Sequence, residues 1–230
     1  MNIEDIAEVN GDRATFSTFG NLKPEEAGKL LACFDGEIVI PAGDRLPDAF
    51  LESLVEHKGI CIGFIDSGGG FGQELSVRDA EILSSYQGRL KFDMPRLNYV
   101  RGHPRLHPPY ADARIHLLQE NELQDEIDIA KAFSKHKGSA LILSTLHTLS
   151  TAAAEELFKH ETPVCIGTEF HTEGQCGRNK EWIANELKQG SYITEWEKIV
   201  MLYSDAEKRW FPNMPEDEYP TNDPCSLDLL

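Results

Sequence analysis

The sequence predicts an α/β fold: a short solenoid of helix–turn–strand units with a parallel sheet and a helical C-terminal cap. Three observations predict it. A turn residue followed by an apolar run recurs along the chain, apolar residues recur at fixed distances before each turn, and from Arg178 onward the pattern changes to helices that contain tryptophan. A unit of this kind cannot bury its apolar side alone, so neighbouring units must stack to form one continuous core.

The repeat array spans residues 22–170, and its units are recognised by their turns. The turn positions are Gly36, Gly59, Gly88, Gly138 and Thr162. The interval from Gly88 to Gly138 is much longer than the others, and we divide it with a further turn at Asp112. This division makes residues 98–121 a degenerate unit of the array.

The residues before each turn predict a helix, and those after it predict a strand. The helix positions that share one face are Leu51 and Leu54, Ala80 and Leu83, Ala130 and Phe133, and Ala154 and Leu157. Their i, i+3 spacing is that of a helix face. The first unit fits with one extra residue, which gives Ala27 and Leu30.

Alternation after each turn assigns the two faces of the sheet. The predicted core positions are Ile38 and Ile40, Leu90 and Phe92, Ala140 and Ile142, and Val164 and Ile166. The intervening Val39, Arg89, Lys91 and Leu141 then face away from the core and form a candidate binding surface. In the second unit, the apolar residues after Gly59 fit the alternation better when the strand is shifted by one residue, so we leave the register of this strand open.

One stretch carries a family resemblance. "LILSTLHTLSTAAAEELFKH", Leu141 to His160, resembles bacterial leucine-rich-repeat-like proteins, in which a leucine-spaced strand, a turn and "LS" precede an alanine-rich helix. The residues at the leucine positions are Leu141, Leu143, Leu146 and Leu149, and the usual asparagine after the strand is absent. The resemblance covers roughly residues 22 to 170 and implies a solenoid that binds a protein partner.

The glycine-rich stretch "SGGGFG", residues 67–72, is interpreted as an inserted loop. The interval between Gly59 and Gly88 exceeds its neighbours by about the length of this stretch, and insertions in repeat proteins form loops on one face. A trypsin-like nucleophile at Ser67 would need a histidine motif that no segment resembles. A phosphate loop would need a lysine after the glycines, where Gln73 and Glu74 stand.

Two further segments hold possible ligands. "RGHPRLHPP" carries His103 and His107 four residues apart, but its prolines are incompatible with the regular helix that would place both on one metal. We add its Arg101 and Arg105 to the candidate binding surface. "EFHTEGQC" offers Glu169, His171, Glu173 and Cys176, a mixture untypical of structural zinc sites. We therefore predict no metal and no cofactor.

Planar rings recur two residues before each turn. They are Phe34, His57, Tyr86, His136 and His160. Because equivalent positions of a solenoid stack, we predict a structural column of rings at the C-terminal ends of the helices, where a histidine nitrogen can also meet free carbonyls. A zinc site built from His57, His136 and His160 is the alternative, and the spacing of the units argues against it.

The two ends of the chain depart from the repeat. Residues 1–21 resemble a truncated unit with Gly11 as its turn, or an N-terminal cap. Residues 171–212 read as amphipathic helices that hold Trp182, Trp196 and Trp210, and we predict that they cap the last unit. The tail, 213–230, is acidic and rich in proline, and is expected to be flexible.

Composition limits the possible functions. The net charge is −17, which disfavours nucleic acid and anionic membranes as partners and would suit a basic protein. Five scattered cysteines without a C-x-x-C motif, together with an acidic N-terminus, indicate a reduced, cytoplasmic protein. We predict a non-enzymatic protein-interaction module. The alternative is a small hydrolase with its nucleophile at Ser67 or Cys176.

Overall fold

The computed structural model describes residues 2–41, 46–65, 75–93, 120–144, 149–167, 184, 188 and 195–213. These residues form an α/β structure with a seven-stranded sheet. The strands are β1 (Ala7–Asn10), β2 (Arg13–Phe16), β3 (Glu37–Pro41), β4 (Cys61–Ile65), β5 (Arg89–Asp93), β6 (Leu141–Ser144) and β7 (Val164–Gly167). The strands lie in sequence order, so each one pairs with the next along the chain. All neighbouring strands run parallel except the β1–β2 hairpin.

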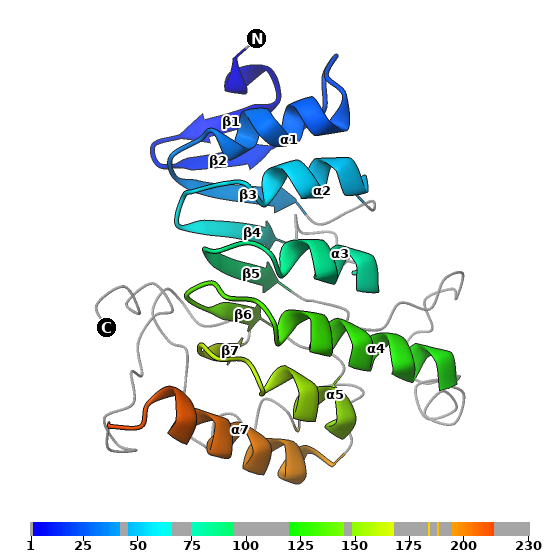
Figure 1. Cartoon of the computed structure of the whole chain (residues 1–230). Coiled ribbons are helices and arrows are strands. Elements are labelled where there is room, and N and C mark those ends of the chain that lie inside the picture. Colours follow the sequence, from blue (N-terminus) through cyan, green and yellow to red (C-terminus); the bar gives the residue numbers. More distant parts are fainter. Residues whose placement is uncertain are drawn as a thin grey trace.

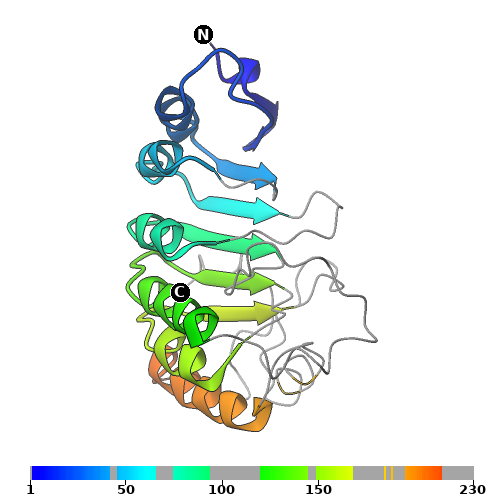
Figure 2. The ribbon, with the colours of Figure 1, turned by 90° about the vertical axis from the view of Figure 1, so that its right-hand side faces the viewer.

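The helices lie in one layer along one side of the sheet (Figures 1 and 2). After the short 3₁₀ helix η1 (Ile3–Asp5), they are α1 (Pro24–Ala32), α2 (Asp48–Leu54), α3 (Val77–Leu83), α4 (Glu120–Phe133), α5 (Thr151–Leu157) and α7 (Trp196–Trp210). The residues just before several helices determine where those helices begin. Ser76 and Ser150 accept hydrogen bonds from backbone N–H groups of the first turn, which are otherwise unsatisfied.

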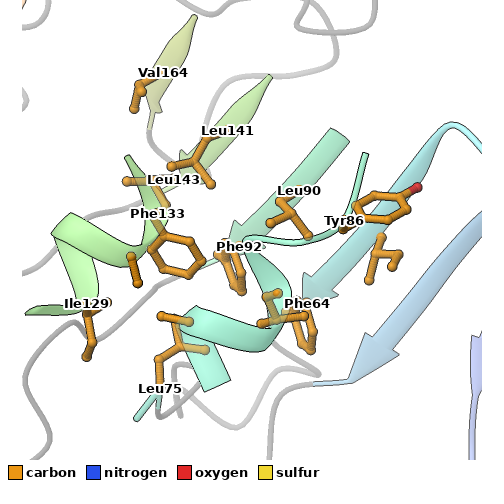
Figure 3. Packing of buried hydrophobic residues seen from close by; sticks show 14 of the residues in the cluster. Phe64, Leu75, Tyr86, Leu90, Phe92, Ile129, Phe133, Leu141, Leu143 and Val164 are labelled. Carbon is orange, nitrogen blue, oxygen red and sulfur yellow. The ribbon is translucent and has the colours of Figure 1, made fainter. Parts of the chain in front are cut away.

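The core lies between the helices and one face of the sheet. Two rows of strand residues fill it, namely Ile38, Ile62, Leu90, Leu141 and Val164, and Ile40, Phe64, Phe92, Leu143 and Ile166. Opposite them lie the helix residues Leu31, Leu54, Leu83, Phe133 and Leu157, all fully buried. In Figure 3, Phe64, Phe92 and Phe133 follow one another, with ring centroids 5.0 and 5.3 Å apart. The predicted helix and strand columns are therefore present, except for the helix position of the first unit and the strand positions of the fourth unit.

Two register predictions were wrong. In the first unit the fully buried leucine is Leu31, while Leu30 is only half-buried, so no extra residue is needed. In the fourth unit Leu141 pairs with Leu90 and belongs to the core, whereas Ile142 lies on the opposite face beside Lys91. An additional turn residue, Ser139, shifts this strand by one position relative to the prediction. The second unit, whose register the sequence left open, is shifted in the same way: Cys61 pairs with Glu37.

The predicted turn at Asp112 lies outside the described residues, and the sheet has no strand for a unit there. Strand β5 pairs directly with β6, so no strand from residues 94–119 lies between them. Helix α4 is twice as long as α3, with 14 residues against 7, and takes up part of the long interval. The predicted loop at 67–72 lies outside the described residues, and β4 and β5 on either side of it keep a continuous parallel register.

At the N-terminal edge, β1 and β2 form a hairpin whose Gly11 has a φ of 62°, a conformation that favours glycine. At the other end, α7 packs against α5 (Figure 1). Tyr203 of α7 donates to the carbonyl oxygen of Val164 at 3.2 Å, and the indole N–H of Trp210 donates to that of His160 at 2.8 Å. These bonds fix α7 to the last unit, where the sequence predicted a cap.

Candidate functional site: the second sheet face and the ring column

The sheet face opposite α1–α5, here called the second face, carries the residues that alternate with the core rows. Its members with described side chains are Glu8, Asn10, Arg13, Thr15, Glu37, Val39, Pro41, Cys61, Gly63, Ile65, Arg89, Lys91, Ile142 and Cys165. Arg13 and Glu37 occupy paired positions on β2 and β3, and Arg13 Nε donates to Glu37 Oε2 at 2.7 Å. This hydrogen bond raises the pKa of Arg13.

The predicted binding residues fall into three groups. Val39, Arg89 and Lys91 lie on the second face as predicted, but Val39 is fully buried and Arg89 is only 4% exposed. Lys91 is half-buried. Leu141 was wrongly placed, because it faces the helices. Arg101 and Arg105 lie outside the described residues.

Accessible side chains on the second face lie on β1 to β5. Glu8, Asn10 and Arg13 are exposed, and Thr15, Glu37, Pro41, Ile65 and Lys91 are half-buried. Ile142 and Cys165 further along the sheet are buried together. Gly63 lies between Glu37 and Lys91, and a Cβ atom there would meet them at 3.7 and 4.0 Å. The β4 backbone therefore lies between side chains of opposite charge. Charged and hydrogen-bonding groups of this kind suit recognition of a polar partner surface.

Arg13 and Glu37 were not singled out from the sequence. Their signal is an acidic residue directly after Gly36 and a basic residue 24 positions earlier, one unit away. That distance becomes meaningful only once β2 and β3 are known to pair in this register.

The second constellation is the ring column, in which three rings, those of His57, Tyr86 and His136, bond to the turn of the preceding unit. His57 Nε2 lies 2.9 Å from the Gly36 oxygen, Tyr86 donates to the Gly59 oxygen at 2.7 Å, and His136 Nε2 lies 3.0 Å from the Gly88 oxygen. In the last unit the hydroxyl of Thr162 donates to the Gly138 oxygen at 2.8 Å. The predicted column exists, but its principal acceptors are turn carbonyls of the neighbouring unit.

The turn glycines are required by this arrangement. A Cβ atom at Gly59, Gly88 or Gly138 would approach the ring of its own unit more closely than 3.0 Å. At Gly59 and Gly138 it would also collide with the carbonyl of the preceding turn glycine. Ring and glycine thus form one packing unit.

Two ring pairs differ in chemistry. His57 and Tyr86 are stacked with centroids 6.0 Å apart, and His136 and His160 are 5.4 Å apart. Burial lowers the pKa of His136 to about 4, with a further lowering by His160, and burial also lowers the pKa of His160. Burial raises the pKa of Tyr86. Among the described residues no group of three candidate metal ligands lies together, and His57 neighbours Tyr86 rather than the other two histidines.

The remaining sequence candidates lie outside the described residues. They are the possible nucleophiles Ser67 and Cys176, the possible ligands Glu169, His171 and Glu173, and the loop residues His103 and His107.

In the described part of the chain, no helix has the length and apolar character needed to span a membrane. Comparisons with protein-family models, with curated proteins and with solved structures found no significant match.

Proposed function

We propose that this chain is a short leucine-rich-repeat-like solenoid that works as a non-enzymatic protein-interaction module in the cytoplasm. The observation that supports it best is the recurrence of one bond, from a ring to the preceding turn carbonyl, in consecutive units. The sequential strand order also supports it. Repeat folds present an extended row of side chains, one set per strand, which suits binding of a protein surface.

The proposed contact surface is the accessible part of the second face, with Arg13, Thr15, Glu37 and Lys91. Mixed charges there would set the orientation of the partner. The net charge of −17 favours a partner that is basic overall, because long-range attraction speeds the encounter. Nucleic acid and membranes are disfavoured as partners by the same charge.

Crosslinking mass spectrometry from cell lysate tests this proposal and supplies the partner. We expect crosslinks close to the second face, and we expect Lys91→Ala to weaken binding of the recovered partner by about tenfold. Lys131→Ala, which removes an exposed lysine from the helix layer, is the matched control and should leave the affinity unchanged. Equal losses in both variants would contradict the assigned surface.

The same preparation tests the hydrolase alternative. Covalent labelling by serine- or cysteine-directed probes that is lost in Ser67→Ala or Cys176→Ala would favour an enzyme over an interaction module.

A further inference from the structure

His136 and His160 stand at the ends of α4 and α5, both 1% exposed, and form a continuous line of polar contacts. His136 Nε2 lies 3.0 Å from the Gly88 oxygen, and His136 Nδ1 lies 3.1 Å from His160 Nε2. His160 Nδ1 lies 2.6 Å from the backbone carbonyl oxygen of Thr162 and 3.1 Å from its backbone nitrogen. The line therefore begins and ends at a backbone carbonyl.

The number of hydrogens on this line determines which contacts can form. A neutral imidazole carries one N–H, and an imidazolium carries two. A neutral pair can donate from His136 to Gly88 and from His160 to His136, while the Thr162 N–H donates to His160 Nδ1. One added proton allows His160 to donate to the Thr162 oxygen instead. A second added proton would set two N–H groups against each other across the 3.1 Å contact.

His160 and other residues of its unit connect that unit to α7. The carbonyl of His160 accepts the indole N–H of Trp210, and the guanidinium of Arg209 donates to the carbonyl of Phe158. Thr151 of α5 donates to Glu195 at 2.8 Å. Separation of the two histidines would therefore disturb the attachment of both α5 and α7.

The exposed charged groups beside the pair are mostly cationic, and α7 also carries the buried Glu207 between Tyr203 and Trp210. Lys135 and Lys137 flank His136, Lys159 and Glu161 flank His160, and Arg209 comes from α7. Glu161 favours the charged imidazole, but burial outweighs it and lowers the pKa of both histidines. Burial therefore disfavours protonation of both rings at once.

We propose that the His136–His160 pair is an acid-sensitive joint, which holds α5, β7 and α7 on the rest of the array while it carries at most one proton and releases them when both rings are protonated. The sign of the pH effect on stability follows from the linkage between proton binding and opening. A histidine with a lowered pKa in the folded state binds fewer protons than in the opened state, so stability is full above the ordinary pKa of about 6.5 and falls as the pH drops toward 4. This inference does not depend on the proposed function.

Native-state amide hydrogen exchange, corrected for the intrinsic effect of pH, tests the joint. Between pH 7 and pH 4.5 we expect opening of α5 and α7 to increase by about 100-fold, with a smaller increase in α1 and α2. In His136→Tyr the increase should fall to about tenfold or less. A tyrosine at this position can donate to Gly88 as Tyr86 donates to Gly59, but it removes the pair. His57→Tyr, which changes another column histidine, should behave like the wild type.

Equal acid-induced opening in the wild type and His136→Tyr would overturn the proposal, as would opening spread evenly over all helices. If His136→Tyr does not fold, an NMR titration of the wild-type imidazoles decides. We expect two coupled steps accompanied by changes in the α7 amide signals. Independent titrations that leave the α7 signals unchanged would also overturn it.

Discussion

Ala154→Asp is expected to reduce the free energy of unfolding by about 4 kcal/mol or more, enough to unfold a marginally stable domain. Ala154 is fully buried in the helix column that faces the sheet. An aspartate there would place an unpaired carboxylate among apolar side chains, or would have to take up a proton to remain inside. Urea unfolding followed by circular dichroism measures the loss.

Ala152→Asp is the matched control, because Ala152 lies on the exposed side of the same helix, α5. It is the second helical residue after the N-cap Ser150, where a negative charge is favourable. We expect a change within about 0.5 kcal/mol. A comparable loss at both positions would disprove the assigned orientation of α5.

Gly138→Ala should be nearly as damaging, with an expected loss of about 3 kcal/mol. The new methyl group would collide with the carbonyl of Gly88 and with the ring of His136. Relief of this overlap requires the ring to leave its hydrogen bond to the Gly88 oxygen, which then stays buried without its donor. Thermal and urea unfolding report the change.

Gly63→Ala provides the comparison. A Cβ atom at Gly63 meets its neighbours only at ordinary van der Waals distances, the nearest being Glu37 Oε1 at 3.7 Å. We expect a change of about 1 kcal/mol or less, and an alanine can stabilise a strand relative to glycine. If Gly63→Ala cost as much as Gly138→Ala, close packing at the turns would not be the cause.

Much of the fold was predictable, because the same spacing has the same physical cause in every unit. The helix column of Leu54, Leu83 and Leu157 and the ring column lie at fixed distances before the turn, and no insertion interrupts those distances. The strand faces were harder to predict. One added turn residue, Ile60 or Ser139, reverses which side chains face the core, because alternation in a strand has a period of two. Leu141 was misplaced for this reason.

The candidate site was less predictable than the fold. A long interval between turns can hold either an extra unit or a longer helix with an insertion. The residues between Gly88 and Gly138 do not distinguish these two arrangements. The Arg13–Glu37 ion pair depends on the register of two strands that are distant in sequence. The exposure of Val39 depends on what covers the sheet, and a strand pattern carries no information about that.

The ring-to-turn bond has a consequence for how such a chain can evolve. Its acceptor is a backbone carbonyl, which every residue type possesses, and its donor has been a histidine, a tyrosine or a threonine in different units. Neighbouring units therefore need not recognise each other's side chains at this joint. At this bond, a change of the donor residue needs no matching change in the acceptor. His136 and His160 differ from the other rings, because their side chains also contact each other through polar atoms.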